Sequence, residues 1–141
     1  MDYAATYQNV ATRYCSSGMN LNKHINSAYL LSPNSKSRVA GYYLLSRNLI
    51  NAPPFINAPV LVVLKTLKHT VSSDTESETS GFFMNAQIEL SVRHALESLG
   101  HPQPPTPVKT ENYTTSGLVH GSMQQKRYKS WYMRYHWLRD K

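Results

Sequence analysis

The chain contains 141 residues, enough for a single domain, and its formal net charge is +7, from 15 Lys and Arg against 8 Asp and Glu. Its one cysteine, Cys15, excludes a disulfide scaffold and the cysteine pairs of a zinc finger. The first residues lack the basic and apolar regions of a secretory signal, and the longest apolar stretch, Pro59–Leu64, is too short to span a bilayer. We therefore expect a small, basic, intracellular protein, cytoplasmic or nuclear, without a membrane partner.

The first half of the chain is typical of strands. A weak helix is predicted over Ala4–Tyr14, where Thr and Asn lower the helix propensity. A first strand is predicted at Leu21–Asn26, ended by Ser27, and a second at Arg38–Ser46. After a loop rich in Pro and Asn, Pro59–Lys68 is predicted as a third strand, buried on both faces at its start because its apolar residues are consecutive.

A long helix is predicted at Asp74–Leu99. Ser73 and Glu76 have the spacing of a capping box, and acidic residues in the first turn favour the positive end of the helix dipole. Gly100 and Pro102 provide a stop signal. Apolar residues follow at helical spacing in the first half of the segment, at Phe82, Phe83, Ala86 and Leu90.

The last quarter begins with a proline-rich connector, Gln103–Pro107, followed by a predicted short strand at Val108–Glu111. Two helices are predicted after it, at Thr114–His120 and at Lys126–Arg139. The second helix carries an aromatic stripe, for which packing onto a sheet is favoured over the stacking of nucleic-acid bases. Three antiparallel strands, a crossover helix and a parallel strand predict the α/β (α+β) class, with helices against a mixed sheet.

Charge is distributed unevenly along the sequence. No acidic residue lies between Tyr3 and Ser73, although seven Lys and Arg do, and five of the eight acids fall between Asp74 and Glu97. A basic segment that is rich in Tyr and Trp is typical of proteins that bind polyanions. The alternative is that the basic residues only keep the chain soluble.

The run Gly100-His101-Pro102-Gln103-Pro104-Pro105-Thr106-Pro107, followed by Thr110-Glu111-Asn112, resembles a stretch of the ribonuclease H domain of copia-type retrotransposon polyproteins. Gly100–Pro107 is similar to that family's G-H-x-Q-P-P-T-P, and Thr110–Asn112 to the start of its T-D-N-S-T-A. Shorter similarities occur at Ser35–Gly41, Gln125–Lys129 and Met133–Leu138. The resemblance implies a connector from the reverse transcriptase at residues 1–20. It also implies a truncated ribonuclease H-like domain at residues 21–141, without its last strand and helix.

The family hydrolyses the RNA strand of RNA–DNA hybrids with two Mg²⁺ ions and needs no small-molecule cofactor. Such ions require converging carboxylates, and the family has four of them. Here Asn26 stands where the first-strand Asp of D-A-x-Y is expected, and Glu111 replaces the fourth-strand Asp. Glu78 matches the helix acid, with Glu76 as the alternative. The fourth acid, in A-D-x-F-T-K, is not found before Lys141.

The resemblance therefore implies a degenerate catalytic set, with Asn26, Glu78 and Glu111 at catalytic positions and only Glu78 and Glu111 able to bind Mg²⁺. We expect a catalytically inactive remnant of the ribonuclease H domain. One alternative is a basic fragment that binds RNA–DNA hybrid or other nucleic acid through phosphate contacts at Arg38, Lys126, Arg127, Lys129 and Arg134. Another is an unselected open reading frame without a stable function.

Overall fold

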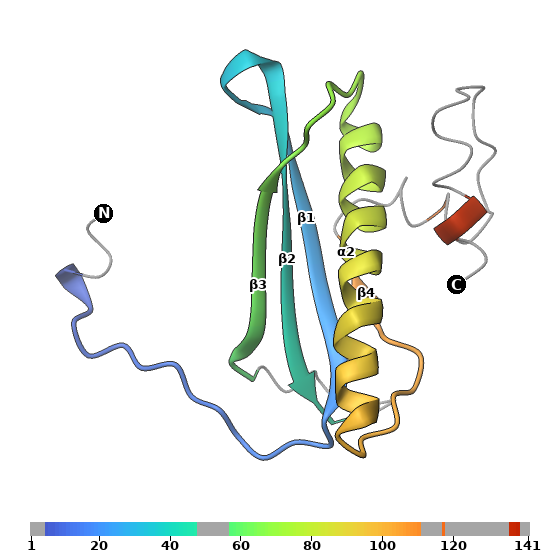
Figure 1. The fold of residues 1–141 in the computed structure, drawn as a ribbon. Coiled ribbons are helices and arrows are strands. Elements are labelled where there is room, and N and C mark those ends of the chain that lie inside the picture. Colours follow the sequence, from blue (N-terminus) through green and yellow to red (C-terminus); the bar gives the residue numbers. More distant parts are fainter. Residues whose placement is uncertain (1–4, 48–56, 111–116, 118–135, 139–141) are drawn as a thin grey trace.

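The computed structural model describes residues 5–47, 57–110, 117 and 136–138 (Figure 1). Its strands are β1 (Asn20–Ser32), β2 (Lys36–Ser46), β3 (Pro59–Thr66) and β4 (Val108–Lys109), and its long helix is α2 (Asp74–Ser98). A single 3-10 turn, Pro33–Ser35, joins β1 to β2. The sheet has the order β3-β2-β1-β4, in which β1 pairs antiparallel with β2 and parallel with β4. The predicted α+β class with a mixed sheet is confirmed.

The core lies between α2 and one face of the sheet (Figure 1). Alternate residues of β1 and β2 point toward the helix, as the period of two along a strand requires, so Leu21, Ile25, Val39 and Tyr43 are buried. Leu96 on α2 packs against Leu21 and Tyr43. The connection between β3 and α2 completes a second cluster with Val39, through Leu67 and Val71.

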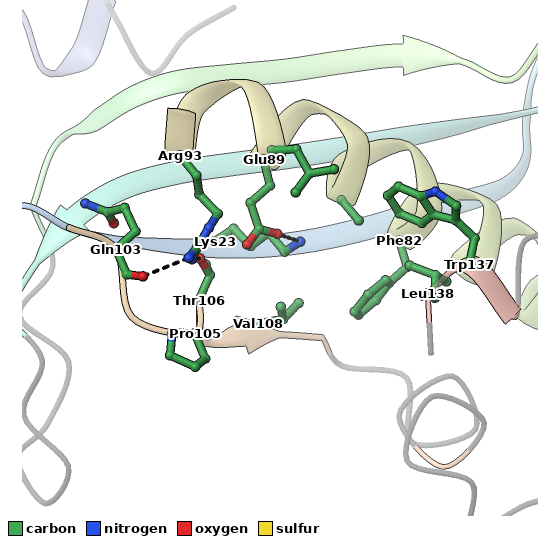
Figure 2. Close-up of a pocket in the computed structure, with 12 residues that line it drawn as sticks. Lys23, Phe82, Glu89, Arg93, Gln103, Pro105, Thr106, Val108, Trp137 and Leu138 are labelled. Carbon is green, nitrogen blue, oxygen red and sulfur yellow. Dashed lines mark hydrogen bonds and ion pairs between the residues drawn. The ribbon is translucent and has the colours of Figure 1, made fainter. Parts of the chain in front are cut away.

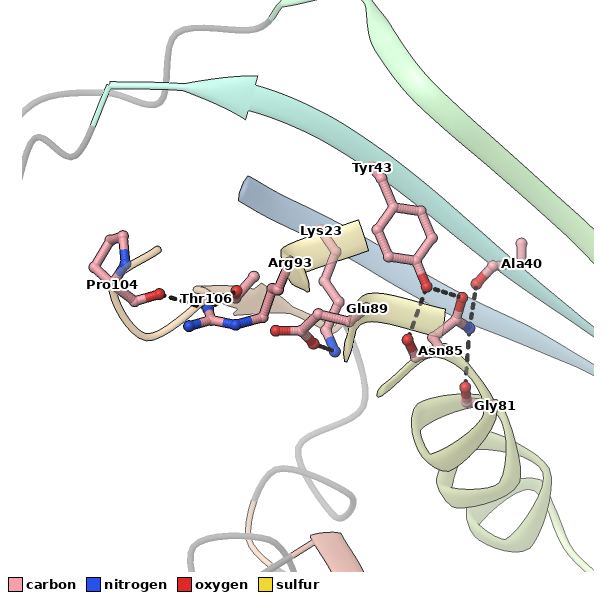
Figure 3. Close-up of polar contacts among 9 residues, drawn as sticks. All are labelled: Lys23, Ala40, Tyr43, Gly81, Asn85, Glu89, Arg93, Pro104 and Thr106. Atoms are coloured by element: carbon pink, nitrogen blue, oxygen red, sulfur yellow. Dashed lines mark hydrogen bonds and ion pairs between the residues drawn. The ribbon is translucent and has the colours of Figure 1, made fainter. Parts of the chain in front are cut away.

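Two glycines allow α2 to approach the sheet closely. A Cβ atom at Gly41 would lie 1.9 Å from Oδ1 of Asn85, and one at Gly81 would lie 3.0 Å from a methyl carbon of Val39. The buried Asn85 amide uses this proximity to donate hydrogen bonds to the carbonyl oxygens of Ala40 (3.2 Å) and Gly81 (2.9 Å). The Tyr43 hydroxyl donates to Asn85 Oδ1 at 2.8 Å, so a polar clamp joins helix and sheet (Figure 3).

The predicted helix is confirmed, and its ends follow from local sequence. The Ser73 hydroxyl accepts a hydrogen bond from the backbone N–H of Glu76 at 3.1 Å. The Glu76 carboxylate accepts from the N–H and the hydroxyl of Ser72, both at 2.7 Å, one residue before the position that a capping box uses. Gly100 adopts a positive φ of 87° after the last turn, a conformation that favours glycine.

Two predictions in the N-terminal part are wrong. Within residues 5–14, only Ala5 and Thr6 are helical, because a short segment with Thr and Asn forms no stable helix without packing. β1 does not end at Ser27 but continues to Ser32. The backbone N–H and the hydroxyl of Ser27 form hydrogen bonds to α2, so they are satisfied without a turn and the strand can continue.

The predicted burial of the third strand on both faces is also wrong. Val60, Val62 and Leu64 are 46%, 61% and 66% exposed. β3 is an outer strand of the described sheet, and α2 covers the other face, toward which Val63 points. A run of apolar residues therefore does not show on which faces a strand is covered.

The end of the chain is described only in part. β4 is the predicted parallel strand, and it pairs with β1 at Val108–Lys109, whereas Glu111 lies outside the described residues. Of the helices predicted at Thr114–His120 and Lys126–Arg139, the described residues are Gly117 and 136–138, all helical. Trp137 packs edge-on against Phe83 on α2, with 5.0 Å between ring centres. In the described part of the chain, no helix is long and apolar enough to cross a membrane.

Candidate functional site

Glu78, the predicted helix acid, lies against β1. It is buried near the start of α2, and its carboxylate accepts a hydrogen bond from the backbone N–H of Ser27 at 3.2 Å. The Ser27 hydroxyl bonds to the hydroxyl of Ser77 at 2.7 Å. Among the described residues, β4 pairs with β1 at Lys23 and His24, so Glu78 accepts from an N–H beyond the end of that pairing. Of the two candidate helix acids, Glu78 faces the sheet, whereas Glu76 caps the helix.

Asn26 and Glu78 do not converge. Asn26 is exposed and lines a shallow pocket with Tyr42 and Leu64, whereas its neighbour Ser27 faces α2. Because successive side chains of a strand point to opposite faces, Asn26 lies on the face of the sheet away from Glu78. The structure thus places these two predicted ligands on different faces of the same strand.

The described residues do not fit a two-metal centre. Mg²⁺ requires several oxygen ligands in a strict octahedral geometry, and Asn26 and Glu78 cannot supply them from opposite faces. In the ranges that the structure describes, no group of three or more His, Cys, Asp or Glu side chains is arranged to hold a metal ion. Glu111, the other predicted ligand, lies outside these ranges.

One of the predicted nucleic-acid contacts can be placed. Arg38 is exposed on β2, where it pairs with Ala28 of β1 and Thr66 of β3. It follows that Arg38 lies on the same face of the sheet as Asn26, because the buried Val39 next to it points toward α2. The other predicted contacts lie outside the described residues: Lys126, Arg127, Lys129 and Arg134.

A pocket of about 500 Å³ lies on the helix side of the sheet, between α2, β1 and the connector that leads into β4 (Figure 2). Lys23 lies in its wall, 1% exposed, and forms an ion pair with Glu89 of α2. The Lys23 ammonium also lies 5.2 Å from the centre of the Phe82 ring. Burial lowers the pKa of Lys23, and the hydrogen bond and charge of Glu89 oppose that change.

Arg93 holds the proline-rich connector against α2 (Figure 3). Its guanidinium donates hydrogen bonds to the carbonyl oxygens of Pro104 (2.6 Å) and Gln103 (2.8 Å) and to the hydroxyl of Thr106 (2.8 Å). The Gln103 amide in turn accepts from the N–H of Leu21 at 2.9 Å. The conspicuous Gln-Pro-Pro-Thr-Pro segment therefore positions β4 beside β1.

Lys23 is paired with Glu89, and Arg93 bonds to the connector, so these side chains hold β1, α2 and the connector together. Lys23, Glu89 and Arg93 were not predicted as site residues, because nothing in their local sequence distinguishes them from surface charges. Gln103 and Thr106 could have been selected from the sequence, because both belong to the motif at Gly100–Pro107. Comparison of the chain with models of known families, with curated proteins and with solved structures finds no match.

Proposed function

We propose that this chain is a non-catalytic nucleic-acid-binding domain, a degenerate relative of the ribonuclease H domain of copia-type retrotransposon polyproteins. The observation that carries the binding function is the separation of charge between helix and sheet. The four strands contain Lys and Arg but no Asp or Glu, whereas all five described acids lie on α2. A sheet without acidic residues favours contact with a polyanion, because no carboxylate repels the phosphates.

The loss of catalysis is supported by the placement of the predicted ligands. A neutral Asn26 on one face of β1 and a Glu78 that bonds to the strand from the other face do not provide a shared metal site. Restoring the missing charge with Asn26→Asp would place the new carboxylate on the face away from Glu78. We therefore expect that this substitution does not create a hybrid-cleaving enzyme.

Binding is tested with a fluorescently labelled RNA–DNA hybrid titrated with the purified chain, with fluorescence anisotropy measured over a series of salt concentrations. We expect saturable binding whose logarithmic affinity falls linearly with the logarithm of the salt concentration, by about 0.9 for each phosphate neutralised in a duplex of B-form charge density. Absence of binding at about 50 mM salt, for hybrid and single strand alike, would refute the proposed function.

Catalysis is tested on the same hybrid with Mg²⁺ present. We expect no hydrolysis by the unmodified chain or by Asn26→Asp. Cleavage that disappears in Glu78→Gln would show that the domain is an active enzyme. Hydrogen exchange supplies the folding control, since unprotected amides throughout residues 59–99 would instead support an open reading frame that does not fold.

A further inference from the structure

The face of the sheet opposite α2 combines aromatic rings with basic side chains. We call it the open face and define it by His24, Asn26, Arg38, Tyr42, Val62, Leu64 and Lys109, whose side chains follow the alternation set by the buried residues between them. All of these except the half-buried Tyr42 are exposed. Part of the open face is hollowed into a shallow pocket of about 360 Å³, lined by His24, Asn26 and Lys109 among others.

The two rings lie side by side at the centre of this face. His24 on β1 is the register partner of Tyr42 on β2, and their ring centres are 6.5 Å apart at an interplanar angle of 58°. Val62 is the partner of Tyr42 on β3. Partial burial, and then the charge of Lys109, lower the pKa of His24, which favours the uncharged form of its ring. An uncharged ring beside a tyrosine provides a surface on which a flat group can stack.

Positive charges flank these rings. Lys109 on β4 is the register partner of His24, and Arg38 lies four residues from Tyr42 on β2, about 13 Å along the strand. Among the described residues, neither Arg38 nor Lys109 takes part in an ion pair. Both charges are therefore available to a ligand that combines planar groups with anionic ones.

We propose that the open face binds single-stranded nucleic acid, with His24 and Tyr42 stacking against bases and with Arg38 and Lys109 contacting phosphates. This inference rests on the proposed function and names its binding surface. A single strand suits the surface better than a duplex, because the faces of paired bases are stacked inside a duplex, whereas a single strand can place them on rings. A second copy of the chain would bring Arg38 and Lys109 of both copies together, where they would repel each other.

The first test measures the affinity for a labelled single-stranded 12-nucleotide RNA. Tyr42→Ala should weaken binding by roughly 5- to 150-fold, which corresponds to the loss of one base–aromatic stack. Tyr42→Phe keeps the ring and should bind within about 2-fold of the unmodified chain. Circular dichroism of each variant monitors the fold. If Tyr42→Ala unfolds, the combined Arg38→Gln and Lys109→Gln variant tests the surface instead.

The second test changes charge without changing the rings. Arg38→Gln combined with Lys109→Gln should lower the slope of logarithmic affinity against logarithmic salt concentration by about 1.4, or 0.7 for each phosphate contact to a single strand. The matched control is Lys65→Gln combined with Lys68→Gln. It removes the same charge, and Lys65 is the register partner of the helix-facing Val39. The control should leave the slope nearly unchanged.

The outcomes separate this inference from the proposed function. If nucleic acid binds but neither Tyr42→Ala nor the Arg38 and Lys109 pair changes the affinity or the slope, the open face is not the binding surface, although the function stands. If neither single strand nor hybrid binds, both proposals fail. A dimer in sedimentation equilibrium that Val62→Lys dissociates would overturn the inference in favour of a second copy on this face.

Discussion

The ion pair between Lys23 and Glu89 allows a quantitative prediction. Lys23 is 1% exposed and Glu89 is 14% exposed, so removal of the carboxylate by Glu89→Gln leaves an ammonium group buried without its counter-charge. Breaking a buried pair in this way costs about 3–5 kcal/mol. Lys23 can avoid part of this cost by losing its proton. The free energy of that deprotonation is therefore an upper limit on the destabilisation caused by Glu89→Gln.

The limit follows from the ordinary lysine pKa of 10.5. Deprotonation at pH 7 costs about 1.36 kcal/mol for each of the 3.5 pH units below that pKa, or about 5 kcal/mol, and at pH 9 only about 2 kcal/mol. In the unfolded chain Lys23 keeps its proton up to about pH 10.5, whereas in the folded Glu89→Gln variant it loses the proton at a lower pH. The free energy of unfolding of Glu89→Gln should therefore rise toward that of the unmodified chain as the pH increases from 7 to 9.

Urea denaturation followed by circular dichroism at both pH values measures this effect. The control is Glu97→Gln, because Glu97 faces Arg93 at 3.9 Å on the exposed surface of the same helix and should contribute less than about 1 kcal/mol. The double replacement Lys23→Met with Glu89→Leu should be far less destabilising than Glu89→Gln alone. A loss below about 1 kcal/mol, or an equal loss at pH 7 and pH 9, would refute this reasoning.

Three further predictions concern stability. Gly41→Ala should lower the free energy of unfolding by about 1–3 kcal/mol, because its Cβ would lie 1.9 Å from Oδ1 of Asn85. Urea denaturation measures this loss, and an unchanged midpoint would show that Asn85 can move aside without cost. Ser73→Ala should cost about 1 kcal/mol through loss of the helix cap, whereas Ser73→Asp, which can cap as well, should restore most of it. The lowered pKa of His24 means that the unfolded chain gains a proton near pH 6.5 before the folded chain does, so stability should fall as the pH drops below 6.5. His24→Gln should flatten this pH dependence, and an equal slope in both proteins would contradict the assignment.

The sequence predicted the elements whose signals are local. Ser73 before the helix and Gly100 after it determine where α2 begins and ends, because a cap and a left-handed residue act within one turn of the backbone. The order of three strands, a helix and a strand led to the mixed sheet, since a crossover helix brings the next strand in parallel. The excess of basic residues in the first half was also evident, because charge is a property of composition.

The candidate site depended on contacts that sequence patterns do not encode. Asn26 and Glu78 were grouped by resemblance, but the alternation of side chains along β1 separates them onto two faces. Nothing in the sequence around Lys23 distinguishes it from a solvent-exposed lysine, and only the packing of α2 buries it beside Glu89. β3 shows the same limit, since an apolar run cannot reveal which of its faces the helix covers.

The sequence by itself thus determined a small basic α+β chain with a capped helix and a short parallel strand, because propensity, capping and net charge are fixed by neighbouring residues. Only the tertiary structure decided that His24, Tyr42, Arg38 and Lys109 share the face of the sheet away from α2, whereas Lys23 is buried beside Glu89 on the other face. The physical reason is that a face forms from residues of different strands, brought together by register and by which side the helix covers.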